Sequence, residues 1–155
     1  MPHHYTATVN WERGNASFSD NRYSRVHRWT FDGGVEVPAS ASPQVVPVPL
    51  SEPAAVDPEE AFVATVSSCH MLWFLSLAAK AGYVVDTYED EAEGLMERRA
   101  DHRLAITRVT LRPRIVYAGT PPTPEQSDAL HEAAHDACFI ANSIRSEVVI
   151  EPREA

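Results

Sequence analysis

A single long helix, predicted from about Pro58 to Ala81, constrains the fold of this chain more than any other segment. In its opening Asp57-Pro-Glu-Glu the aspartate can cap free N–H groups, proline suits the first helical position, and two acids face the positive end of the helix dipole. Gly82 marks its end. The helix is apolar on nearly all sides, so we expect it to be central and buried. One chain offers too few strands to cover it, and we therefore expect a homodimer with these helices at its centre.

Alternating β-forming residues predict strands on both sides of this helix. The predicted strands span Tyr5–Trp11, Tyr23–Phe31, Tyr83–Met96, Ile106–Tyr117 and Ser146–Ile150. The first two and the next two are each expected to pair as an antiparallel hairpin. Thr123-Pro-Glu-Gln repeats the capping pattern and predicts a second helix to about Phe139. The order β-β-loop-α-β-β-α-β predicts the α+β class.

The segment from Pro38 to Pro58 holds six of the chain's twelve prolines. Because proline lacks a backbone N–H and fixes φ, this segment is neither a regular helix nor an interior strand. We expect a long extended loop that crosses a surface or forms part of a binding site.

Size and charge narrow the class of protein. A chain of 155 residues fits one domain, which we expect to span residues 1–155. The net charge of −9 repels phosphate backbones, so nucleic acid is not an expected partner. The N-terminus lacks the pattern of a secretory leader, and polar residues interrupt the longest apolar stretch. We therefore expect a cytoplasmic protein with no membrane partner.

Only two cysteines occur, Cys69 in the first predicted helix and Cys138 near the end of the second. Two are too few for a disulfide-rich secreted scaffold, which leaves redox chemistry, metal binding or core packing. A cysteine in a buried helix is most often a small hydrophobic core residue. The residues around each cysteine are therefore needed to choose between these roles.

Both cysteines lie in segments that resemble the signature regions of the OsmC/Ohr family. The first is Asp57-Pro-Glu-Glu-Ala-Phe-Val-Ala-Thr-Val-Ser-Ser-Cys-His, with a Pro-Glu pair ten residues before a Ser-Cys. The second is His131-Glu-Ala-Ala-His-Asp-Ala-Cys-Phe-Ile-Ala-Asn-Ser, a helix ending in the second cysteine followed by Asn-Ser. The resemblance implies an OsmC-like fold, with antiparallel sheets wrapped around two central helices in an intertwined homodimer.

The resemblance also implies a thiol-dependent peroxidase that reduces organic hydroperoxides or hydrogen peroxide. Cys69 would attack the O–O bond and become a sulfenic acid, and Cys138 would resolve it as a disulfide. A thiol or dithiol reductant would then restore the pair, with no cofactor and no metal. Chemistry sets the same demands, because the thiolate is the nucleophile and a sulfenate must meet a second thiol before further oxidation.

By the same resemblance, Glu59 would hold an arginine beside the reactive thiol. Ten residues of straight helix rise about 15 Å, so Glu59 cannot touch Cys69 on one continuous helix. Either the helix is broken or Glu59 acts on the partner subunit's site, unless it is only a helix-capping acid. Thr30 stands where OsmC-like sequences carry the arginine, so Arg25 is the first candidate and Arg13 the second. A solvated strand arginine is the alternative.

Three of the residues that follow Cys69 in the sequence, His70, Trp73 and Phe74, are candidates for the substrate site. His70 points about 100° away from Cys69 around the helix, which favours a supporting or core position over that of a catalytic base. Trp73 and Phe74 suit an apolar pocket for an organic hydroperoxide, with core packing as the alternative.

Two other functions remain open from the sequence. His131, His135 and Cys138 share one predicted helix face and could join Cys69 in a tetrahedral zinc site. A non-enzymatic binding protein on the same fold, with the proline-rich loop over a ligand pocket, is the other alternative.

Overall fold

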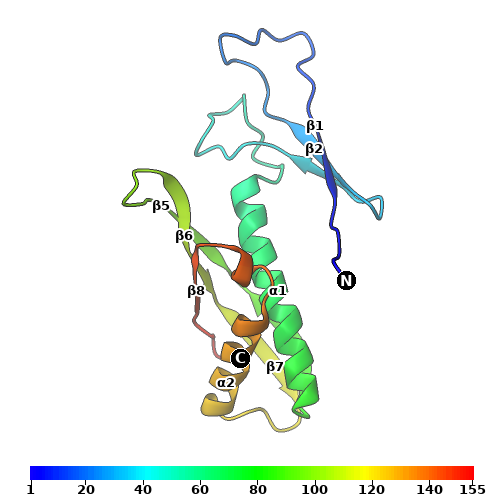
Figure 1. Ribbon diagram of the computed structural model, residues 1–155, viewed down its shortest axis with the longest axis vertical. Helices are drawn as coiled ribbons and strands as arrows, with labels where there is room; N and C mark the ends of the chain where they lie inside the picture. Colours follow the sequence, from blue (N-terminus) through cyan, green and yellow to red (C-terminus); the bar gives the residue numbers. More distant parts are fainter. The chain divides into compact units, whose positions relative to one another are not determined.

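The computed structural model describes all 155 residues, which form two compact units, Met1–Ala61 and Phe62–Ala155 (Figure 1). The expectation of one domain over the whole chain stays a prediction.

The first unit contains a three-stranded antiparallel sheet in the order β1-β2-β3. Its strands are β1 (Ala7–Asn10), β2 (His27–Phe31) and β3 (Glu36–Ala39). The β1–β2 hairpin confirms the predicted pairing, whereas β3 was not predicted. A turn at Gly34, with φ of 90°, returns the chain into β3, and Pro38 is tolerated there because β3 is an edge strand.

The predicted strand from Tyr23 is wrong at its start, because β2 begins only at His27. The residues before it form a loop that Arg25 organises. Its guanidinium donates to the carbonyl and side-chain oxygens of Asn21 and lies over the ring of Tyr23 at 3.7 Å. These local contacts compete with strand pairing.

Helix α1 (Pro58–Lys80) confirms the main sequence prediction. Asp57 and Glu60 cap it reciprocally: the Glu60 N–H donates to the Asp57 carboxylate, and the Asp57 N–H donates to the Glu60 carboxylate, both at 2.8 Å. After the last turn, Gly82 takes φ of 90°, the left-handed conformation that ends helices.

Within one chain α1 buries only one face. Its buried residues are Val66, His70, Phe74 and Ala78. Its exposed stripe consists of Thr65, Ser68, Leu72, Ser76 and Ala79. By length and composition alone α1 could cross a membrane, and only 22% of its most apolar window is buried inside the chain. In the single chain this stripe is open to solvent.

The two strands predicted over Tyr83–Met96 and Ile106–Tyr117 are in fact four. They are β4 (Val84–Asp90), β5 (Glu93–Arg98), β6 (Leu104–Leu111) and β7 (Pro113–Ala118). β4 pairs with β7 and β5 pairs with β6, both antiparallel, so the predicted hairpin exists but is broken in its middle into two sheets.

Asp90 bridges this break. Its carboxylate accepts the backbone N–H of Arg112 at 2.6 Å, in the gap between β6 and β7. The other carboxylate oxygen accepts the hydroxyl of Ser67 on α1 at 2.5 Å. One side chain therefore replaces a missing ladder bond and also anchors the helix two residues before Cys69.

The chain ends with helix α2 (Pro124–Ala137), the short 3₁₀ helix η1 (Ala141–Ser143) and strand β8 (Glu147–Ile150). Thr123 caps α2 through a reciprocal pair of bonds with Gln126, as predicted. β8 pairs with β6 in parallel, an exception among otherwise antiparallel pairings. Figure 1 shows α2 beside α1, and contacts between His70 and His131 confirm that the two helices pack together.

Two apolar clusters form the core of the second unit. One gathers around Phe74, Ala78, Ile115 and Ala134, and the other around Val66, Val109 and Leu111. Gly94 on β5 lets the sheet approach α1, since a Cβ there would lie 2.5 Å from a methyl group of Val63. The α+β class, with two helices and antiparallel sheets, is confirmed.

Replacing Asp90 by alanine is expected to destabilise the second unit. The change leaves the Arg112 N–H and the Ser67 hydroxyl without their acceptor. The free energy of unfolding should fall by about 1–3 kcal/mol for each group that is left buried and unpaired. Urea unfolding of the full chain measures the loss. Glu91→Ala is the matched control, because it removes only an exposed ion pair with Arg153, worth about 0–1 kcal/mol. Equal losses from the two changes would contradict the bridging role.

Candidate active site

The two cysteines, far apart in sequence, meet where α1 and α2 pack. Cys69 lies midway along α1, and Cys138 is the C-cap residue that ends α2. Both thiols are free, and they lie close enough together for the Cys69 side chain to raise the pKa of the Cys138 thiol. Contact between two free thiols is what forming a disulfide between them requires.

The two thiols differ in access. Cys138 is 1% exposed, and the Ala141 N–H donates to its sulfur at 3.4 Å. Burial, and then the nearby Cys69 side chain, raise the pKa of the Cys138 thiol, so it stays protonated near neutral pH. Cys69 is half-buried and is the thiol that a molecule from solvent can reach.

An aromatic pair, Trp73 and Phe139, lies close in sequence to the two thiols. Trp73 is one turn after Cys69, and Phe139 follows Cys138 directly. Their rings meet edge to face, with centroids 5.4 Å apart and planes at 82°. Phe139 is 67% exposed, so the apolar surface beside the thiols is open. The sequence analysis missed Phe139, which its place next to Cys138 could have indicated.

Phe74 occupies a different environment from Trp73. It is fully buried in the core and stacks on the ring of His131, with centroids 4.3 Å apart. The structure therefore places Phe74 in the core, away from any accessible surface of the chain, and Trp73 carries the apolar side of the candidate site.

His70 belongs to a buried histidine pair. Its Nε2 lies 3.0 Å from Nδ1 of His131, with one ring donating and the other accepting, and the rings are nearly parallel. The remaining nitrogens, His70 Nδ1 and His131 Nε2, are buried without a partner. The two rings join α1 to α2, and His70 directly follows Cys69 in the sequence.

Both rings are neutral at physiological pH. Burial lowers the pKa of His70 to about 4; nearby His135 lowers it further, and the carboxylate of Asp90 opposes the shift. Burial and the neighbouring His70 lower the pKa of His131 to about 4.

The structure does not assemble the alternative zinc site. No group of three or more histidine, cysteine, aspartate or glutamate side chains converges in a way that could hold a metal ion. His131 is engaged by His70, and Cys138 is the C-cap residue just after the last residue of α2.

Glu59 and the candidate arginines lie in the first unit. One carboxylate oxygen of Glu59, Oε2, is buried and has no hydrogen-bond partner. α1 is unbroken between Glu59 and Cys69, so the two stand about 15 Å apart along its axis. The guanidinium of Arg25 is engaged within its own loop, and that of Arg13 donates to the carbonyl of Ala16.

Comparison with known proteins identifies the class. Residues 51–153 match the family model described as OsmC-like protein, so the chain belongs to the OsmC-like family. An OsmC-like protein of unknown function from Vibrio cholerae is 52% identical and superposes with a TM-score of 0.95, over 98% of this chain and 100% of that one. No curated protein matches the chain.

More distant structures share the fold. An organic hydroperoxide resistance protein from Legionella pneumophila is 18% identical, with a TM-score of 0.68 over 99% of this chain and 97% of that one. The organic hydroperoxide resistance protein OhrB of Bacillus subtilis is also 18% identical, with a TM-score of 0.65 over 99% and 98%.

The histidine pair predicts a specific loss of stability in acid. Above about pH 6.5 both rings are neutral in the folded and unfolded chain; between about 6.5 and 4 only the unfolded chain takes up their protons. The free energy of unfolding should fall by about 1.4 kcal/mol per pH unit for each ring across this window. Chemical unfolding at a series of pH values measures the slope.

His70→Gln should flatten this slope, because glutamine does not titrate. Carboxylates protonate in part of the same pH window, so the test compares the slope of the wild type with the slope of the variant. The control is His102→Gln, which removes a histidine that is exposed. Identical slopes for wild type and His70→Gln would show that the pair does not couple protonation to folding.

Proposed function

We propose that the protein is a thiol-dependent hydroperoxide reductase in which Cys69 attacks the peroxide and Cys138 resolves the product. The contact between an accessible thiol and a buried thiol carries this proposal. An attacking cysteine needs access to solvent, whereas a resolving cysteine needs only access to the first.

The reaction proceeds in two balanced steps. The Cys69 thiolate attacks one peroxide oxygen, the O–O bond breaks, and the departing alkoxide takes a proton to leave as an alcohol. Cys69 is then a sulfenic acid. The Cys138 thiol attacks its sulfur, an S–S bond forms, and the hydroxyl leaves with the thiol proton as water.

A cellular thiol or dithiol completes the cycle by reducing the disulfide through exchange. Sulfur alone carries the electrons, so the cycle asks for no cofactor. A cytoplasmic location, where thiols are kept reduced, is part of this proposal.

Organic hydroperoxides are the proposed substrates. The open aromatic pair of Trp73 and Phe139 gives the thiols an apolar flank suited to an alkyl or aryl group. The description of two structural neighbours as organic hydroperoxide resistance proteins supports the same class.

The free carboxylate oxygen of Glu59 supports a role in holding a guanidinium, because a buried anionic oxygen without a partner is costly. Its distance from Cys69 along α1 directs that role to the partner subunit's site. Arg25 is the proposed cation, and it would have to exchange its loop contacts for the carboxylate.

The exposed stripe of α1 supports the homodimer. It carries hydroxyl groups, from Thr65, Ser68 and Ser76, beside apolar residues, and hydroxyls are better placed in a protein interface than in lipid. Cys69 lies at the flank of this stripe. A second copy over the stripe would therefore form one wall of each thiol site.

The two cysteines should respond differently to replacement. Cys69→Ser should reduce peroxide consumption to the rate of buffer alone, because a serine hydroxyl is not ionised near neutral pH and cannot accept oxygen as sulfur does. Cys138→Ser should consume about one equivalent and stop as a sulfenic acid, which excess peroxide converts to sulfinic acid. Cumene hydroperoxide consumption, thiol titration and mass spectrometry measure these outcomes.

Ser17→Ala serves as the control, since it removes an exposed hydroxyl outside α1 and away from its interface stripe. Full turnover by Cys69→Ser, or thiols of the wild type that stay reduced in excess peroxide, would refute the proposal.

The dimer depends on the exposed stripe of α1. Leu72 is 61% exposed in the single chain, and Leu72→Glu should convert the dimer to a monomer or an unfolded chain at micromolar concentration, because it buries a charge in the interface. Leu104→Glu is the matched control, a leucine 64% exposed on β6. Light scattering without detergent measures the mass. A wild type that is monomeric, or soluble only in detergent, would overturn the dimer.

A further inference from the structure

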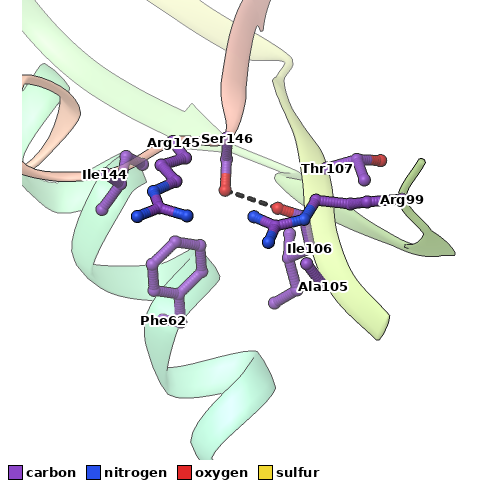
Figure 2. Close-up of a pocket in the computed structure, with 8 residues that line it drawn as sticks. All are labelled: Phe62, Arg99, Ala105, Ile106, Thr107, Ile144, Arg145 and Ser146. Carbon is purple, nitrogen blue, oxygen red and sulfur yellow. Dashed lines mark hydrogen bonds between the residues drawn. The ribbon is translucent and has the colours of Figure 1, made fainter. Parts of the chain in front are cut away.

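The second unit holds a pocket that neither cysteine lines. Its volume is about 490 Å³, within the range of small-molecule sites. It is lined by Phe62, Arg99, Ala105, Ile106, Thr107, Ile144, Arg145 and Ser146 (Figure 2). The lining combines four apolar side chains with two arginines, a composition that nothing in the proposed peroxidase reaction uses.

The two arginines differ in charge balance. Arg99 donates two hydrogen bonds to the carboxylate of Asp101, at 2.5 and 3.4 Å, which offsets its charge. Arg145 forms no ion pair and donates no hydrogen bond within the chain, although the protein carries 22 acidic residues against 13 basic ones. The pocket therefore offers close to one uncompensated positive charge.

The backbone next to Arg145 is anchored by Ser146. The hydroxyl of Ser146 donates to the carbonyl of Ile106 at 2.6 Å and so ties the segment before β8 to β6. Figure 2 shows the guanidinium groups of Arg145 and Arg99 both directed into the space above the ring of Phe62. A ligand here meets planar donors on one side and apolar surface on the other.

We propose that this pocket binds an organic monocarboxylate with a short apolar chain. A carboxylate matches the planar fork of a guanidinium and balances a single positive charge. A phosphate dianion would leave excess negative charge in a chain already at −9. The apolar tail would lie against Phe62, Ile106 and Ile144, and this contact separates the ligand from small inorganic anions.

The site is distinct from the thiols. Phe62 precedes Cys69 by seven residues, two helical turns or about 10 Å along α1. Binding of a carboxylate that is not a peroxide therefore tests this proposal without requiring any reaction at sulfur.

Calorimetric titration of the full-length, reduced protein with octanoate tests the site, with 1-octanol as the probe that keeps the tail and lacks the charge. Octanoate is expected to bind at least about 10-fold more tightly than octanol, and Arg145→Gln should weaken octanoate about 10-fold or more while leaving octanol unchanged. Arg114→Gln, at an exposed arginine on β7 outside the pocket, should change neither.

Equal affinities for octanoate and octanol would overturn the proposal, as would octanoate binding that survives Arg145→Gln or no binding at millimolar concentration. Repeating the titration with Cys69→Ser keeps the two proposals separate. Octanoate binding that is unchanged by Cys69→Ser supports a pocket independent of the thiols. A wild type that binds octanoate but does not consume peroxide would refute only the peroxidase proposal, and an active wild type that does not bind octanoate would refute only the carboxylate site.

Discussion

The carboxylate of Asp90 links the main parts of the second unit. It accepts the N–H of Arg112 where the long hairpin divides into two sheets, and the hydroxyl of Ser67 where α1 crosses them. Without an acceptor at this point, the break would leave a backbone N–H unpaired and the helix without a polar anchor. Because Ser67 lies two residues before Cys69, the same carboxylate that joins the sheets also anchors the part of α1 that carries this thiol.

The thiol pair depends on how the two helices pack, and the two cysteines differ in where each lies along its helix. Cys69 is midway along α1 at the edge of the uncovered stripe, whereas Cys138 caps α2 and is shielded by the turn that follows. The histidine pair between the helices is neutral, so the site gains no positive charge from it. The cation that a thiolate needs must come from elsewhere, which is why the unpaired oxygen of Glu59 matters for the proposed dimer.

The sequence predicted α1, α2 and the fold class because caps and apolar periodicity are local signals. It predicted one strand where β4 and β5 stand, since both halves alternate and only the acidic run Asp90-Glu91 hinted at a break. The contact between Cys69 and Cys138 followed from family resemblance rather than from periodicity. The Arg145 pocket left no pattern at all, because its lining comes from four separate segments that only the fold brings together.

The parallel pairing of β8 with β6 has a consequence for the order of assembly. The β4–β7 and β5–β6 pairs belong to one hairpin and close short loops, whereas β8 joins β6 only after the chain has passed through α2. Loop closure makes such a crossover the slower event. Cys138 lies inside that crossover, so a newly made chain brings its two thiols together only as this late segment folds.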